Sequence, residues 1–188
     1  MNFDPAAAYL DEAWRGLRGH KRLAEGAFEQ ITDEQFFRVL DPEANSVALI
    51  VKHITGNMRS RFTDFLASDG EKPWRHRDQE FLSTADDTRA ALMQRWEESW
   101  KLVLDTIHSL KPDHLGRTVT VRGEEYTVLQ AVQRQVVHYA YHVGQIVFLA
   151  KHLRGAAWKT LSIARGQSDS PASREAEKNW KQGRTSQK

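Results

Sequence analysis

The stretch TVLQAVQRQVVHYAYHVGQIVFLAKHL, residues 127–153, decides the fold that this sequence predicts. Its apolar residues recur at spacings of three and four, which is the period of a helix with one face in a core. Thr127 can cap the start of this helix, and Gly155 follows its end. We therefore expect a long helix from Thr127 to about Leu153. The residues of this helix that we expect inside the core are Leu129, Val132, Val136, Ile146, Val147 and Leu149.

The same period recurs in three other segments. They are residues 4–28, residues 45–69, and a segment that starts at Ser83, Thr84 or Asp86 and ends near Ile107. Residues 32–40 predict a short connector, and the polar residues 71–85 have no sustained period, which predicts a long loop. Four amphipathic helices with one long crossover are typical of an all-α protein built as a four-helix bundle.

A small β-hairpin is expected just before the last long helix. β-Branched residues alternate around Arg122 and Gly123 within residues 117–126, a pattern typical of two short strands and a turn. The length of 188 residues suits one domain, which we place at residues 1–165. The composition then turns polar, so residues 166–188 are expected to form a loosely held C-terminal tail.

The composition excludes several classes of function. The chain has no cysteine, so disulfides, thiolate metal sites and a cysteine nucleophile are ruled out. A formal net charge of +2 is too small to predict nucleic-acid binding. The sequence has neither an apolar leader nor an apolar run of the ~18 residues that a membrane span needs, so we expect a cytoplasmic protein without membrane contact.

Three histidines form the candidate functional constellation. His138 and His142 stand four residues apart in the predicted last helix, so their side chains share one face and lie close enough to bind one ion. Their neighbours are apolar, and a bare imidazole is costly to bury there. His53 borders the apolar stripe of the second long helix, and an adjacent helix would bring it to the same pocket.

A competing interpretation treats each histidine as an ordinary polar residue in or near the core, and the residues alone leave the two interpretations balanced. Two known kinds of metal site do not match. A di-iron bundle places Glu three residues before its His, whereas Gln135 precedes His138 here. A zincin places Glu directly after its first His, and Tyr139 holds that position. Neither pattern therefore supplies a general base beside the ligands.

Two segments, HITGNMRSRF at residues 53–62 and HYAYHVGQI at residues 138–146, resemble the DinB-like superfamily. The chain is most similar to an uncharacterised branch of it, on the loop DGEKPWR at residues 69–75 and on Asp78, Glu80 and Phe81. The resemblance implies an up-down-down-up four-helix bundle, a homodimer, and a metal held by His53, His138 and His142. Three imidazoles accept several divalent ions, zinc or nickel first, with iron or copper as alternatives.

Characterised members of that superfamily include metal-dependent thiol transferases and a thiol-dependent isomerase. By resemblance, we expect a metal-dependent enzyme that binds a low-molecular-weight thiol or another small-molecule substrate, with hydrolysis by an activated water as the alternative chemistry. Asn57 and Gln145, about one turn from the ligands, and Trp74 and Arg75 in the long loop are the candidate substrate-binding residues.

Two other functions stay open. The ion can serve as a non-catalytic fastener between helices in a structural or stress-related module. Alternatively, the protein binds a macromolecular partner through the loop side chains Trp74, Arg75, Arg77 and Phe81, because Trp and Arg are favoured at interaction hot spots. The three functions differ in what they require. An enzyme needs a metal with an open coordination position, a structural module has a closed metal site, and a partner-binding protein needs no metal.

Overall fold

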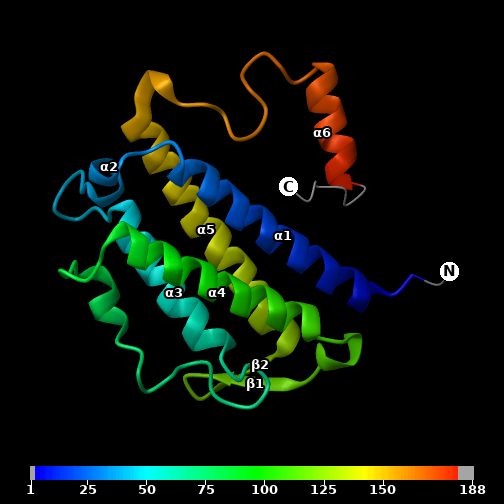
Figure 1. Cartoon of the computed structure of the whole chain (residues 1–188). Helices are drawn as coiled ribbons and strands as arrows, with labels where there is room; N and C mark the ends of the chain where they lie inside the picture. The colour runs from blue at the N-terminus through cyan, green and yellow to red at the C-terminus, as the bar shows by residue number, and fades with distance from the viewer. Residues whose placement is uncertain (1–2, 182–188) are drawn as a thin grey trace.

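Four long helices make up most of the chain, and each begins where a polar side chain accepts a hydrogen bond from the backbone of its first turn. These helices, with the residue that caps each, are α1 (Pro5–Phe28, Asp4), α3 (Val47–Phe62, Ser46), α4 (Arg89–Ser109, Thr88) and α5 (Val128–Arg154, Thr127). The computed structural model describes residues 3–181, with side chains through residue 176, and is mostly helical (Figure 1).

Shorter elements join and follow these helices. They are α2 (Asp33–Phe37), the 3₁₀ helices η1 (Arg77–Phe81), η2 (Pro112–His114) and η3 (Gly155–Ala157), strands β1 (Thr118–Val121) and β2 (Glu124–Thr127), and α6 (Pro171–Lys181). Among residues 3–181, no helix combines the length and the apolar character that a bilayer span requires.

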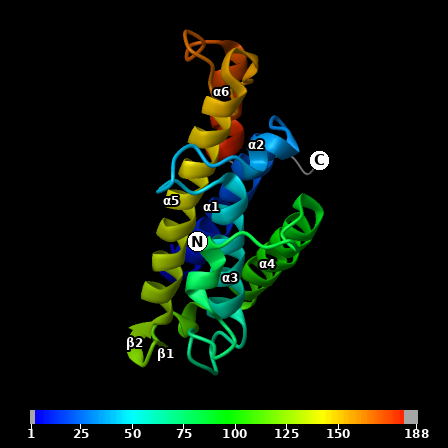
Figure 2. The same cartoon turned by 90° about the vertical axis from the view of Figure 1, so that its left-hand side faces the viewer.

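The long helices pack around one apolar core. Helix α1 contacts α5 and α4, and α3 in turn contacts α4 and α5, so the four helices close a ring in the order α1, α4, α3, α5. Figures 1 and 2 show them side by side, with the hairpin at the end where α5 begins. The largest fully buried side chains of this core are Trp96, Trp100, Tyr139, Phe36, Phe62 and Leu17. The ring thus places the middle of α3 against the middle of α5.

The predicted hairpin is confirmed. Strands β1 and β2 pair antiparallel, with Thr118 opposite Thr127 and Val121 opposite Glu124. Arg122 and Gly123 form the turn and both have positive φ angles, of 60° and 76°, as the tight turn of a two-residue hairpin loop requires. Val119 and Val121 of β1 are buried, which fixes the hairpin against the helices.

Two helix boundaries differ from the predicted ones. Helix α3 ends at Phe62 rather than near Asp69, because Asp64 adopts a positive φ of 50° and its carbonyl closes a turn with the amides of Ala67 and Ser68. Helix α4 begins at Arg89, capped by Thr88, and not at residues 83–86. There Thr84 donates its hydroxyl and its backbone amide to the carboxylate of Asp87, which forms a turn in place of a helix start.

One further expectation was wrong in detail, and one segment has more regular structure than its composition indicates. Leu129 is 40% exposed rather than inside, because it lies on the outer face of the first turn of α5, whose inner face carries the buried Val128 and Val132. Part of the segment that the composition indicates as a loose tail forms helix α6. The chain before α6 is held at the turn that follows α1, where the Gln30 side-chain amide pairs with the backbone N–H and carbonyl of Lys159. Short-range composition gives no sign of that contact.

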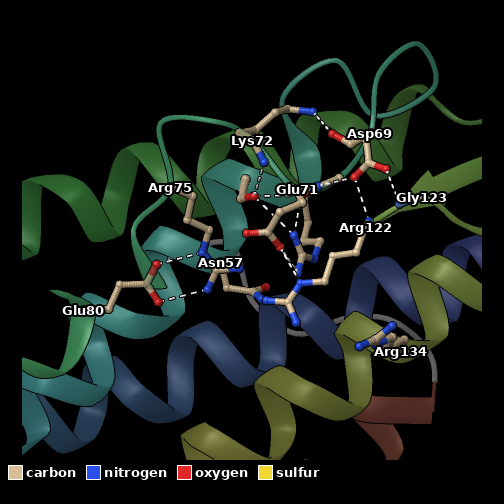
Figure 3. Close-up of polar contacts among 12 residues, drawn as sticks. Asn57, Asp69, Glu71, Lys72, Arg75, Glu80, Arg122, Gly123 and Arg134 are labelled. Carbon is tan, nitrogen blue, oxygen red and sulfur yellow. Dashed lines mark hydrogen bonds and ion pairs between the residues drawn. The ribbon is translucent and has the colours of Figure 1, made fainter. Parts of the chain in front are cut away.

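The loop that follows α3 is fastened to the hairpin turn. The Asp69 carboxylate accepts hydrogen bonds from the backbone N–H groups of Glu71 (2.6 Å), Arg122 (2.9 Å) and Gly123 (2.8 Å), as Figure 3 shows for the turn. The Glu71 carboxylate accepts from the guanidinium groups of Arg122 (2.9 Å) and Arg61 (3.1 Å). The N–H groups of Glu71 and Gly123 lower the pKa of Asp69 the most, to about 2.

We expect Asp69→Asn to lower the free energy of unfolding at pH 7 by about 1–3 kcal/mol, because an amide turns an N–H towards backbone donors. The pKa of Asp69 in the fold, about 2, lies below its ordinary 3.8, so its stabilising effect is full above that ordinary value and disappears as the pH falls through 2. Urea denaturation at several pH values from 7 to 2 should show that the difference in the free energy of unfolding between Asp69→Asn and the parent shrinks as the pH falls. The exposed Asp86→Asn is the control, and a difference independent of pH would contradict the assignment.

Candidate metal centre

The ring of helices brings the three histidines together. His53 comes from the middle of α3 and is buried, whereas His138 and His142 come from the middle of α5 and are half-buried. Each offers one ring nitrogen, and these three atoms lie within 4.8 Å of one another. The Nε2 atoms of His138 and His142 are 3.0 Å apart. The i, i+4 spacing and the contact between α3 and α5 together produce this cluster.

Acceptors beside two of the rings fix where their protons lie. Nδ1 of His53 donates to Oε2 of Glu80 over 2.8 Å, and Nδ1 of His142 donates to Oε1 of Gln145 over 2.8 Å. A neutral imidazole has one N–H, so Nε2 of each ring keeps its lone pair. Metal-binding histidines in proteins almost always have such an acceptor on the second nitrogen.

The cluster fits a divalent ion. Two imidazole nitrogens at about 2.0–2.1 Å from one tetrahedral ion lie roughly 3.3 Å apart, close to the 3.0 Å between His138 and His142. Burial lowers the pKa of His138 to about 3, with the neighbouring His142 and His53 adding to the effect, and burial also lowers the pKa of His142. These two rings are therefore neutral near pH 7, which is the form that binds a cation.

Glu80 is a buried carboxylate that the helical pattern did not predict. It lies in η1 and forms a two-pronged ion pair with Arg75, from Nε to Oε1 (2.8 Å) and from Nη2 to Oε2 (2.9 Å), as Figure 3 shows. Burial alone would raise the pKa of Glu80, but hydrogen bonds from His53 and Arg75 outweigh it and hold this pKa below its ordinary value. The group beside His53 is therefore a carboxylate anion.

Three of the four candidate substrate-binding residues have partners inside the protein. The Asn57 side-chain oxygen accepts a hydrogen bond from the Tyr139 hydroxyl (3.0 Å), in the core. Gln145 accepts the proton of His142, and Arg75 is paired with Glu80. Trp74 differs, since it is 48% exposed with the Arg59 guanidinium 5.4 Å from its ring centre. The structure thus gives Gln145 and Arg75 roles around the histidines.

One residue of α3 marks the place where Glu80 approaches. Gly56 lies one turn after His53, and a Cβ atom built on it would come within 2.8 Å of the Glu80 Cδ. A glycine inside a helix commonly marks a close approach of another group. The glycine three residues after His53 was therefore the one sign in the sequence that something packs against this face.

A model of the family described as "Protein of unknown function (DUF1572)" matches residues 4–167. This chain belongs to that family. The match spans all three histidines, Glu80 and the four long helices, and ends before α6. No protein of curated function matches this DUF1572 chain. The function must therefore be argued from the histidine cluster itself.

We expect Gly56→Ala to lower the free energy of unfolding by about 1–3 kcal/mol, because the added methyl group must displace Glu80 or α3. Gly16→Ala in α1 is the matched control: nothing lies within 4 Å of its added Cβ, so it should be neutral or stabilising by up to about 1 kcal/mol. Urea denaturation of both variants measures the contrast. Equal effects of the two substitutions would show that Glu80 does not press against α3.

Proposed function

We propose that this protein binds one divalent metal ion through His53, His138 and His142 and uses the remaining coordination position for catalysis. The observation that carries the proposal is the convergence of three ring nitrogens within 4.8 Å. Imidazole ligands suit zinc, nickel, iron and copper, and we favour zinc or nickel. The ring of four long helices supports, in addition, the four-helix bundle of the DinB-like superfamily, whose histidine positions match these three.

The chemistry follows from the ligand set. Three protein ligands are typical of catalytic sites, whereas structural zinc sites use four. A divalent ion held here would supply Lewis acidity towards a small-molecule thiol or a water in the open position. The chain has no cysteine, so a thiol nucleophile has to come from a substrate. Glu80 and Gln145 keep the protons of His53 and His142 at Nδ1, and the half-buried rings of α5 leave the cluster accessible from outside. A thiol transferase or a hydrolase is the reaction class we propose.

The homodimer that the resemblance implies is a further part of this proposal. Three exposed apolar side chains, Val137, Tyr141 and Phe148, share one face of α5. This face is turned away from the core and offers apolar area to a second copy of the chain. A binding protein without metal is the weaker alternative, because Arg75 and Phe81 of the loop are engaged with Glu80 and His53.

Elemental analysis after reconstitution with zinc or nickel should find one ion per chain. His53→Ala, His138→Ala and His142→Ala should each lose it, because two imidazoles hold an ion far more weakly than three. His152→Ala is the control, since this exposed histidine lies near the end of α5, away from the cluster. A parent without bound ion, or an ion that all three substitutions leave in place, would refute the proposal.

Cobalt(II) substitution should distinguish a catalytic site from a structural one. We expect added 2-mercaptoethanol to change the visible spectrum of the cobalt protein and to produce a sulfur-to-metal charge-transfer band, because an open position accepts a thiolate. The His138→Ala variant provides the background for unspecific cobalt binding. A spectrum that no thiol or anion alters would indicate a closed site and favour the structural module.

A further inference from the structure

We propose that Glu80 is a positioning residue for His53, held in place by Arg75, and that it sets both the tautomer and the direction of this imidazole. The inference rests on the metal site proposed above and adds a residue outside the three ligands. It starts from one carboxylate that has two buried partners: Oε2 of Glu80 accepts from Nδ1 of His53 and from Nη2 of Arg75, and Oε1 accepts from Nε of Arg75.

The geometry leaves His53 little freedom. Its ring stacks on Phe81, with ring centres 4.8 Å apart and planes 28° apart, while Nδ1 is held by Glu80. A ring fixed through one nitrogen and one face presents the other nitrogen in a single direction. Oriented in this way, Nε2 of His53 can join the Nε2 atoms of His138 and His142 without reorganisation, and a ligand already in place costs less entropy on binding.

The residues around Glu80 hold its carboxylate at this position. Arg75 and Glu80 are both buried, where an unpaired charge would be expensive, so each stabilises the other. Gly56 leaves the space that the Glu80 carboxylate occupies on α3. Beyond η1, the Lys52 ammonium group binds the backbone carbonyl of Leu82 (2.7 Å) and the Asp87 carboxylate (2.6 Å). The loop is thus anchored on both sides of Glu80.

The same loop offers a matched control. Glu71 is also a loop carboxylate in a pair with arginines, Arg61 and Arg122, and Figure 3 shows it beside Arg122; unlike Glu80, it forms no hydrogen bond or ion pair with the three histidines. Glu71→Gln and Glu80→Gln each remove one charge from an arginine pair. Any effect of Glu80 that arises only from stabilising the loop should therefore appear in both variants.

The experiment compares the parent with Glu80→Ala, Glu80→Gln and Glu71→Gln in two measurements. Competition with a chromophoric chelator gives the zinc affinity, and imidazole ¹⁵N NMR of the apo protein gives the His53 tautomer. We expect Glu80→Ala to bind zinc about 10- to 100-fold more weakly and to lose the preference for the proton at Nδ1. Glu80→Gln should keep part of the zinc affinity and part of the preference for the proton at Nδ1, since its amide oxygen still accepts from Nδ1. Glu71→Gln should match the parent in both measurements.

The outcomes separate this inference from the proposed function. Zinc affinity and tautomer unchanged in Glu80→Ala, or equal losses in Glu80→Gln and Glu71→Gln, would overturn the positioning role while leaving the metal site intact. A parent that binds no zinc would overturn the proposed function, and the apo NMR spectra would still decide whether Glu80 sets the tautomer. If Glu80→Ala does not fold, the comparison of Glu80→Gln with Glu71→Gln decides the result.

Discussion

Every imidazole placed on the inner side of a helical core needs a partner for each of its polar nitrogens, and this constraint organises the contact between α3 and α5. Three polar groups at this contact have such partners: His53 pairs with Glu80, His142 with Gln145, and the Tyr139 hydroxyl with Asn57. The two histidine pairs use Nδ1 of His53 and of His142, and the Nε2 atoms of His142 and His138 lie 3.0 Å apart. The same hydrogen bonds that make burial tolerable therefore also create a set of three ligands.

The second organising feature is the connection between α3 and α4. A chain segment of this length without a regular period would be expected to move, yet its first part is fixed to the hairpin turn through Asp69, and its later part is fixed to α3 through Glu80. Both anchors are carboxylates that accept several hydrogen bonds, which holds them as anions. The hairpin, the loop and the histidine cluster are consequently connected through hydrogen-bonded charges as well as through apolar packing.

The sequence predicted the parts of this structure that depend on periodicity. The four long helices, the hairpin turn at Arg122 and Gly123, and the face shared by His138 and His142 all follow from spacing along the chain. Helix ends were less predictable, because Thr84 and Asp87 hydrogen-bond to each other in a turn and Thr88 caps the start of α4. The sequence marked Glu80 only as part of the resemblance, and its contact with His53 could not be predicted from spacing, since a loop residue 27 positions after His53 meets it only through tertiary folding. Gly56 is the local feature of α3 that fits this approach.

The proposal of a catalytic role over a structural one rests on the balance of charge around the cluster. The imidazoles of His138 and His142 are neutral near pH 7, and the negative charge of Glu80 is matched by Arg75. No carboxylate within the described residues joins the three-histidine cluster as a fourth candidate ligand. Neutral imidazole ligands would not cancel the charge of a divalent ion, so the open position that we propose would attract an anion such as a thiolate. A structural site would gain nothing from that uncancelled charge, whereas a reaction that needs an activated anion at neutral pH depends on it.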